Sequence, residues 1–131
     1  MITINNGSPQ GVGLSLDIAV TAGNILIVNY YVGAYGNAVR HWGAGMWFDG
    51  NSLGDGGYSA TWMGGIEDHN QANFTGWTNR SGFQWHTIAS TGTYTLELKM
   101  KTNSGTLDVW RDAQWGQSYD SPRWYAQEIQ Q

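Results

Sequence analysis

Residues 94–101 read Tyr-Thr-Leu-Glu-Leu-Lys-Met-Lys, and this stretch decides the fold class. Apolar side chains at every second position alternate with Thr, Glu or Lys, which is typical of a β-strand with one buried and one charged face. Thr102–Gly105 is a turn signal, and residues 106–111 predict a returning strand, so the two segments predict a β-hairpin. We expect Tyr94, Leu96, Leu98 and Met100 to be buried, and Thr95, Glu97, Lys99 and Lys101 to face solvent or a partner.

A second hairpin is predicted nearer the N-terminus. Residues 12–20 repeat the period-two pattern, with Val12, Leu14, Leu16, Ile18 and Val20 on one expected buried face. A turn signal at residues 21–24 leads into residues 25–32 (ILIVNYYV), which are nearly continuously apolar. Such a run predicts a strand covered on both faces. In so small a protein, one of these faces is expected to meet another subunit.

The remaining chain predicts shorter strands at residues 58–63, 84–89 and 123–129. Residues 33–57 are rich in glycine and predict long ordered loops, with short strands around His41–Trp42 and Met46–Phe48. Residues 64–82 are polar and rich in turn formers. About eight strands predict an all-β protein with a jelly-roll β-sandwich over residues 11–131, preceded by an N-terminal arm over residues 1–10.

Composition limits the classes of partner. The chain has 131 residues, enough for one domain, and only 12% are charged, with a net charge of −4. The six basic residues form no run, so neither a nucleic-acid nor a membrane partner is expected. Cysteine is absent, which favours folding in a reducing cytoplasm. No signal peptide and no apolar run of about 20 residues is visible.

No motif for catalysis, cofactor binding or metal binding is present, so we expect no cofactor and no enzyme. Residues 67–70 (EDHN) are the densest polar cluster, and a loop tip explains them better than a metal site. Eight tryptophans are too many for a small core, so some are expected at an interface or on sugar rings. Trp110, on the charged side of its strand, and Trp115, in a polar loop, are the candidates for exposure. Ile2 and Ile4 are predicted to anchor the N-terminal arm on a neighbouring subunit or on a particle.

Residues 92–101, 104–107, 121–123 and 128–129 carry a resemblance to a known family. The pattern is a Gly-Thr-aromatic-Thr strand start, an apolar/basic strand, a Gly-Thr turn, and a closing Ser-Pro-Arg…Glu-Ile strand. It resembles jelly-roll modules of tailed-phage structural proteins, which are similar to the globular head of complement and to tumour necrosis factor. The resemblance covers about 40 C-terminal residues and implies a homotrimer in a virion.

Such modules commonly follow a long fibre shaft, and here residue 1 leads within ten residues into the first strand. This favours a trimeric capsid decoration protein that binds major capsid subunits on the outer surface of the particle, after synthesis in the host cytoplasm. One alternative is a receptor-binding fibre tip that recognises host surface glycan. Another is a small glycan-degrading enzyme or a non-viral lectin.

Overall fold

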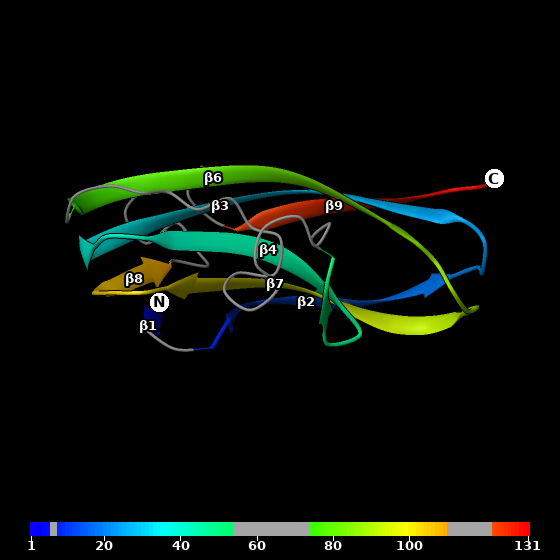
Figure 1. Cartoon of the computed structure of the whole chain (residues 1–131), viewed down its shortest axis with the longest axis horizontal. Helices are drawn as coiled ribbons and strands as arrows, with labels where there is room; N and C mark the ends of the chain where they lie inside the picture. Colours follow the sequence, from blue (N-terminus) through cyan, green and yellow to red (C-terminus); the bar gives the residue numbers. More distant parts are fainter. Residues whose placement is uncertain (6–7, 54–73, 110–121) are drawn as a thin grey trace.

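The protein is built from two antiparallel β-sheets. The computed structural model describes residues 1–5, 8–53, 74–109 and 122–131, and these form nine strands and no helix (Figure 1). One sheet, called sheet A, has five strands: β1 (Ile2–Asn5), β8 (Thr106–Val109), β3 (Ile25–Val39), β6 (Phe74–Thr87) and β9 (Arg123–Ile129). The other, sheet B, has four: β2 (Gln10–Val20), β7 (Gly92–Thr102), β4 (Trp42–Phe48) and β5 (Asn51–Ser52). The all-β, sandwich-like class predicted from the sequence is confirmed.

Strand β3 is the centre of sheet A. It pairs with β6 along one side, and along the other side with β9 over residues 25–31 and with β8 over residues 35–37. Leu26, Val28 and Val32 face sheet B and are fully buried or nearly so, as period-two alternation requires. The core is therefore a single apolar cluster with members from both sheets.

Tyr30 connects the two sheets through the core. Its hydroxyl donates a hydrogen bond to the backbone oxygen of Ala44 on β4, at 2.8 Å. Gly82 lies opposite Tyr30 on β6, and a Cβ atom there would clash with the tyrosine ring. Glycine at this position makes room for the ring that joins sheet A to sheet B.

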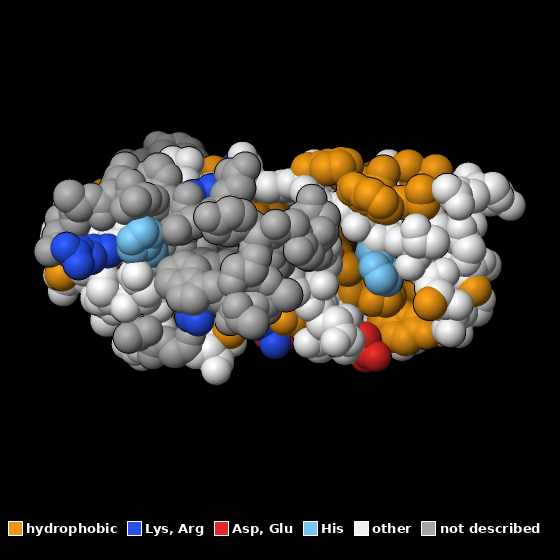
Figure 2. Space-filling view, in the orientation of Figure 1, with side chains coloured by type: hydrophobic (Ala, Val, Ile, Leu, Met, Phe, Trp, Pro, Cys, Tyr) orange, Lys and Arg blue, Asp and Glu red, His pale blue; other side chains and the backbone are white. Residues whose placement is uncertain are grey.

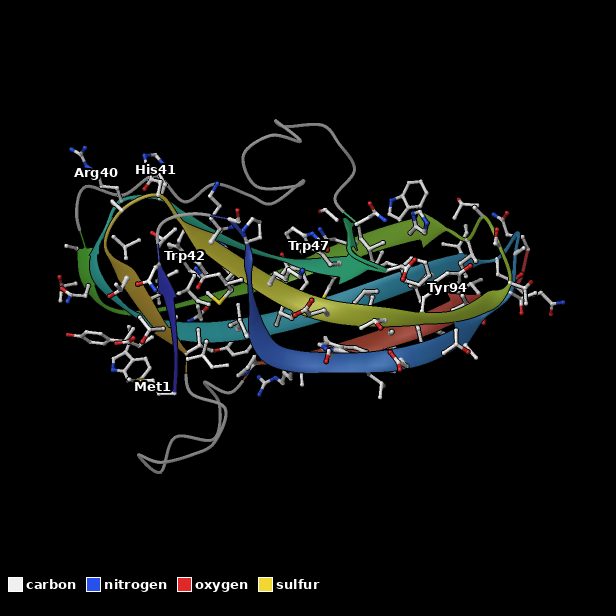
Figure 3. The ribbon with its side chains drawn as sticks, turned by 90° about the horizontal axis from the view of Figure 1, so that it is seen from below. Met1, Arg40, His41, Trp42, Trp47 and Tyr94 are labelled. Atoms are coloured by element: carbon white, nitrogen blue, oxygen red, sulfur yellow. The ribbon has the colours of Figure 1, made fainter. Side chains whose placement is uncertain are left out.

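The side chains of strand β7 point to the sides of the sheet that the sequence predicts. Leu96, Leu98 and Met100 are fully buried and Tyr94 is half-buried. Thr95 is exposed, while the charged side chains of the alternate row are half-buried. Figure 3 shows the interior side chains Trp42 and Tyr94 toward opposite ends of the sandwich. The predicted register of residues 94–101 is therefore confirmed.

Both predicted hairpins are wrong, although their strands exist. β2 pairs with β7 and not with β3, and β8 pairs with β1 and β3 and not with β7. The short turns between these strands carry the chain from one sheet to the other. Packed sheets lie about 10 Å apart, a distance that a four-residue connection also spans. The sequence of such a turn does not distinguish pairing within a sheet from crossing between sheets.

Strand β2 departs from its predicted burial at one residue. Val12 and Val20 are buried, and Leu14 and Ile18 are half-buried. Leu16 lies opposite Leu96 in the register but is 56% exposed. In the part of the chain that the structure describes, β2 pairs only with β7 and so lies at an edge of sheet B, where burial is incomplete.

The loops expected over residues 33–57 and 64–82 are largely replaced by strands where the structure describes them. β3 continues to Val39, β4 is buried on both faces, and β6 begins at Phe74 and runs without interruption into the predicted strand at residues 84–89. The strand predicted at residues 58–63 lies outside the described residues. β4 and β5 are joined by Asp49-Gly50, both with positive φ (49° and 79°), as in a type I′ hairpin turn.

The two chain termini both enter sheet A. Ile2–Asn5 pairs with β8, and Ile4 is fully buried in the core, so these residues belong to this chain's own sheet and not to an arm that lies on a neighbouring subunit or a particle. β9 matches the strand predicted at residues 123–129 and pairs with β3. The C-terminus lies at the end of the sandwich opposite β8 (Figure 1).

Candidate interaction surfaces

The outward side of β9, β3 and β6 forms a surface that we call the outer aromatic face. Because odd-numbered residues of these three strands point away from sheet B, the register brings their side chains together. Four of its aromatic residues are 55–61% exposed. The face consists of Ile25, Ile27 and Tyr31 of β3, Trp77, Phe83 and Trp85 of β6, and Tyr125 and Ile129 of β9.

The outer aromatic face is close to electrically neutral. Arg123 is the one charged side chain on the outward rows of β9, β3 and β6 within the described residues, and its guanidinium lies 4.5 Å from the centre of the Tyr31 ring. The other polar members are amides and hydroxyls, such as Asn29 between Phe83 and Tyr125 in the register. Figure 2 shows hydrophobic side chains gathered along the β6 side of the molecule. Such a face suits an apolar or neutral partner better than a phosphate-rich one.

The exposed area of this face is large for a small protein. If an aromatic residue presents roughly 200 Å² when free, four that are 55–61% exposed present about 450 Å² together. Isolated soluble domains rarely expose apolar patches beyond a few hundred Å² unless the patch binds something. Trp77 is also held in place by an edge-to-face contact with Tyr35, with ring centres 5.6 Å apart.

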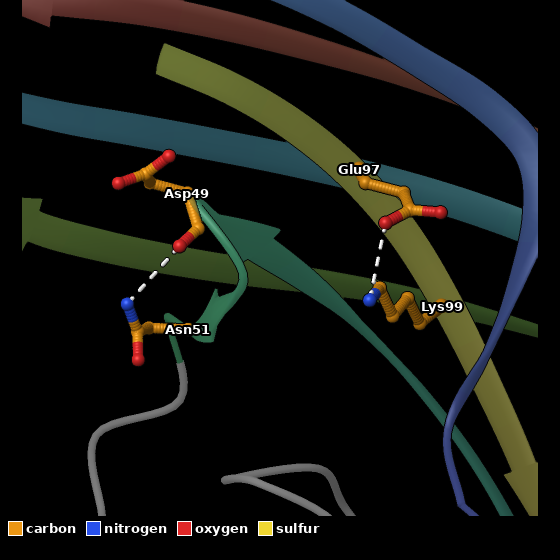
Figure 4. Close-up of polar contacts among 4 residues, drawn as sticks. All are labelled: Asp49, Asn51, Glu97 and Lys99. Atoms are coloured by element: carbon orange, nitrogen blue, oxygen red, sulfur yellow. Dashed lines mark hydrogen bonds and ion pairs between the residues drawn. The ribbon is translucent and has the colours of Figure 1, made fainter.

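The outward row of β7 in sheet B has the opposite character. Glu97 and Lys99 form an ion pair at 3.1 Å (Figure 4), and the Lys99 ammonium lies 5.7 Å from the Trp47 ring. The Thr95 hydroxyl donates to the Asp17 carboxylate at 2.7 Å. These charges and hydroxyls find partners within the chain, as on an ordinary solvated sheet face.

A pocket of about 280 Å³ lies between the β4–β5 turn and the connection from β6 to β7. Its apolar lining includes Phe48 and Tyr94, whose ring centres are 4.8 Å apart, and Phe48 also packs against His86 at 5.5 Å. Polar side chains surround these rings. They are Asp49, Asn51, Ser52, His86 and Ser90.

Glu128 is a titratable group with a structural role. Its carboxylate accepts hydrogen bonds from the Thr21 backbone N–H and the Asn24 side-chain amide, both at 2.7 Å. The bond from Asn24, followed by that from Thr21, holds the pKa of Glu128 below its usual value because both stabilise the charged form. The contact joins β9 to the connection between β2 and β3.

Of the four contact residues predicted from the sequence, two lie in strand β1 and two lie outside the described residues. Ile4 belongs to this chain's own core, so its side chain is not available to anchor a partner, and Ile2 is half-buried beside Val109. Trp110, Trp115 and residues 67–70 lie outside the described residues. Over residues 1–5, 8–53, 74–109 and 122–131, no three His, Asp or Glu side chains gather as metal ligands. Nor is any helix in that part of the chain long and apolar enough to cross a membrane.

Sequence reasoning missed the outer aromatic face. The signal was the odd-numbered row Trp77, Asn79, Ser81, Phe83 and Trp85, which alternates with even positions that face the core. It was obscured by Gly76, Gly82 and the polar residues of that row, which favour a turn-rich loop when read locally. Only the pairing with β3 shows that these positions share one face.

Known proteins do not identify this chain. No protein-family model matches it, and no curated protein or solved structure matches it either.

Proposed function

We propose that this chain is a trimeric decoration protein of a phage capsid, which works by surface contact and not by catalysis. The observation that carries the proposal is the outer aromatic face. A neutral surface with exposed Trp77, Phe83, Trp85 and Tyr125 is what a protein interface needs at its centre, where aromatic residues are enriched and charges are depleted.

The trimer would use this face as its subunit interface. Ile25, Ile27 and Tyr31 explain why the central strand reads as apolar on both sides: one side meets sheet B, and the other would meet a second copy. The aromatic members offer about 450 Å² of the roughly 800 Å² that each partner buries in a stable complex, and their neighbours would supply the rest. A closed ring of three copies would leave no aromatic face exposed.

The jelly-roll topology and the phage setting rest on the resemblance noted in the sequence. Two of the segments that carry it are strands, residues 92–102 as β7 and residues 123–129 as β9, and this supports the proposal. The chain also crosses repeatedly between sheets, which a jelly roll requires. On a capsid, the surfaces outside the trimer interface would bind the major capsid subunits on the outside of the particle.

The test is the mass of the protein in solution together with its binding to capsids that lack it. The wild-type protein should scatter light as a trimer and decorate such capsids in multiples of three. Trp85→Ser should shift the mass to a monomer, while Lys101→Ala, on the outward row of β7, should leave the trimer intact. A wild-type monomer in solution that also binds capsids as single copies would refute the trimer.

A second candidate function, a receptor-binding fibre tip that recognises host glycan, is favoured by a different feature. The pocket beside Tyr94 combines aromatic rings with polar groups, which is the combination that a sugar needs. A receptor-binding protein would adsorb to host cells by itself, whereas a decoration protein would bind only particles.

A further inference from the structure

The pocket at the β4–β5 turn has two walls that are held in place without a ligand. On one side, the Asp49 backbone N–H donates to the Thr95 oxygen at 2.8 Å, and the Leu53 N–H donates to the Met46 oxygen at 2.9 Å. On the other side, the Ile88 N–H donates to the Asn24 oxygen at 2.9 Å, and the Tyr94 hydroxyl donates to the Ser90 oxygen at 3.2 Å. Largely preformed walls reduce the entropy lost when a ligand binds.

The turn itself places its side chains at the pocket. Asp49 adopts the left-handed conformation (φ 49°), which the following Gly50 continues, and the Asn51 amide donates to the Asp49 backbone oxygen at 3.2 Å. Figure 4 shows the side chains of Asp49 and Asn51 on one side of this turn, away from the Glu97–Lys99 pair. The turn therefore places a carboxylate, which accepts hydrogen bonds, close to a side-chain amide at the pocket.

Several polar groups of the pocket have unused hydrogen-bonding capacity. Among the described residues, the Asp49 carboxylate, the His86 ring nitrogens and the Ser90 hydroxyl have no hydrogen-bond partner. These groups surround the rings of Phe48 and Tyr94. A ligand with an apolar ring face and several hydroxyl groups would satisfy both kinds of lining at once.

Charge and size narrow the class of ligand. The described lining holds one carboxylate and no Lys or Arg, so a phosphate, sulfate or carboxylate ligand would be repelled. A volume of about 280 Å³ holds about nine water molecules at roughly 30 Å³ each, which is room for one small ring and not for an extended chain. An organic cation could use the aromatic rings and Asp49, but it would leave the Ser90 hydroxyl and the Asn51 amide without a role.

We propose that this pocket binds a single neutral sugar ring, with Asp49 and Asn51 holding its hydroxyls and Tyr94 contacting its apolar face. The ring is the terminal unit of a glycan, because the pocket has no room for a second unit. The site is independent of the proposed trimer interface, since it lies on the β4, β6 and β7 ends and not on the outward rows of β9, β3 and β6.

The test is a titration of the wild-type protein, followed by backbone amide NMR shifts, with methyl glycosides of glucose, galactose and N-acetylglucosamine. At least one should shift the amides of Asp49, Asn51 and Ser90 in a saturable way. N-acetylneuraminic acid, which carries a carboxylate, and choline, a small organic cation, should not. Choline binding without sugar binding would overturn the proposal, and so would saturable sugar shifts confined to the outer aromatic face.

Asp49→Asn is the decisive variant, because asparagine tolerates the left-handed conformation and keeps the turn. It should weaken sugar binding by about tenfold or more, since it removes a charged acceptor. Asp17→Asn, an exposed acid on β2, is the matched control and should bind as the wild type does. Unchanged affinity in Asp49→Asn would overturn the site. Trimer mass and capsid binding should be the same in both variants, so failure of the pocket is distinguishable from failure of the proposed function.

Discussion

The outward rows of the two sheets differ in chemistry although both belong to one sandwich. On β7 of sheet B, Glu97 and Lys99 pair with each other, and Thr95 binds Asp17 on the neighbouring strand. On β9, β3 and β6 of sheet A, the corresponding rows carry exposed aromatic residues and, among the residues that the structure describes, the single charge of Arg123. The β7 row satisfies its polar groups within the chain, whereas the sheet A rows leave apolar area in water. The difference indicates that water is the natural neighbour of the first face and a partner that of the second.

The largest expected effect is the difference in stability between a variant of the buried row of β7 and a variant of its outward row. Leu98→Ala should lower the free energy of unfolding by roughly 2–5 kcal/mol, because it leaves a cavity in the core. Lys99→Ala, one residue away on the outer row, should cost about 1 kcal/mol or less. Denaturant unfolding of the two variants measures both values. Equal losses would mean that the outward row of β7 is not a solvated face.

The next effect tests whether the sheet A face is an interface. Tyr125→Ser should weaken trimer association by about 2 kcal/mol or more, because its ring is 61% exposed in the single chain and would be buried between copies. Thr95→Ala, on the outward row of β7, should leave association unchanged. Sedimentation equilibrium gives both association constants. Weaker association of Thr95→Ala together with unchanged association of Tyr125→Ser would instead place the interface on sheet B.

The salt dependence of trimer association also distinguishes an interface on sheet A from one on sheet B. An interface made by the neutral aromatic face should keep its association constant in 1 M salt, where the screening length falls to about 3 Å. An interface made by the charged row of β7 would weaken. Sedimentation of the wild-type protein at low and high salt distinguishes the two.

A smaller effect is expected for the ion pair itself. Glu97→Ala should change the free energy of unfolding by about 0.2–1 kcal/mol, since the pair lies on a partly exposed surface. The difference from the wild type should shrink as salt is added, which thermal or denaturant unfolding will show. A loss that persists at high salt would point to packing by the glutamate stem and not to charge.

The smallest effect concerns Glu128, on the row of β9 that faces inward. Its pKa is lowered in the folded state, so its stabilising contribution is present above the unfolded-state pKa and is lost as pH falls through the folded-state pKa. Glu128→Gln should therefore be less stable than the wild type at neutral pH, and the difference should disappear in acid, once the pH has fallen below the lowered pKa of Glu128 in the folded state. Gln127→Ala, on the outward row, is the control and should show no such pH dependence. A gap that does not depend on pH would contradict the role of the charge.

The sequence by itself determined the strands whose side chains alternate. Residues 94–101 and 123–129 could be assigned, with the facing of Leu96, Leu98 and Met100, because the β period of two is a local property of the backbone. The apolar character of residues 25–32 on both sides was also visible. The Asp49-Gly50 dipeptide was a further local signal for a tight turn, and it was overlooked.

Only the tertiary structure decided which strands are neighbours and which outward rows combine. β2 and β3 are adjacent in the sequence but lie in different sheets, because a short turn can cross the gap between sheets as easily as it can form a hairpin. Trp85, Phe83 and Tyr125 become one surface because each pairs with a residue of β3 that is about 55 to 95 positions away. The pocket likewise brings Asp49 together with His86 and Ser90, which are about 40 positions away. Local patterns carry no information about such long-range pairing, and Ile4 shows the consequence. It was expected to anchor an arm on a partner, yet it fills this chain's own core because β8 offers β1 a place at the edge of sheet A.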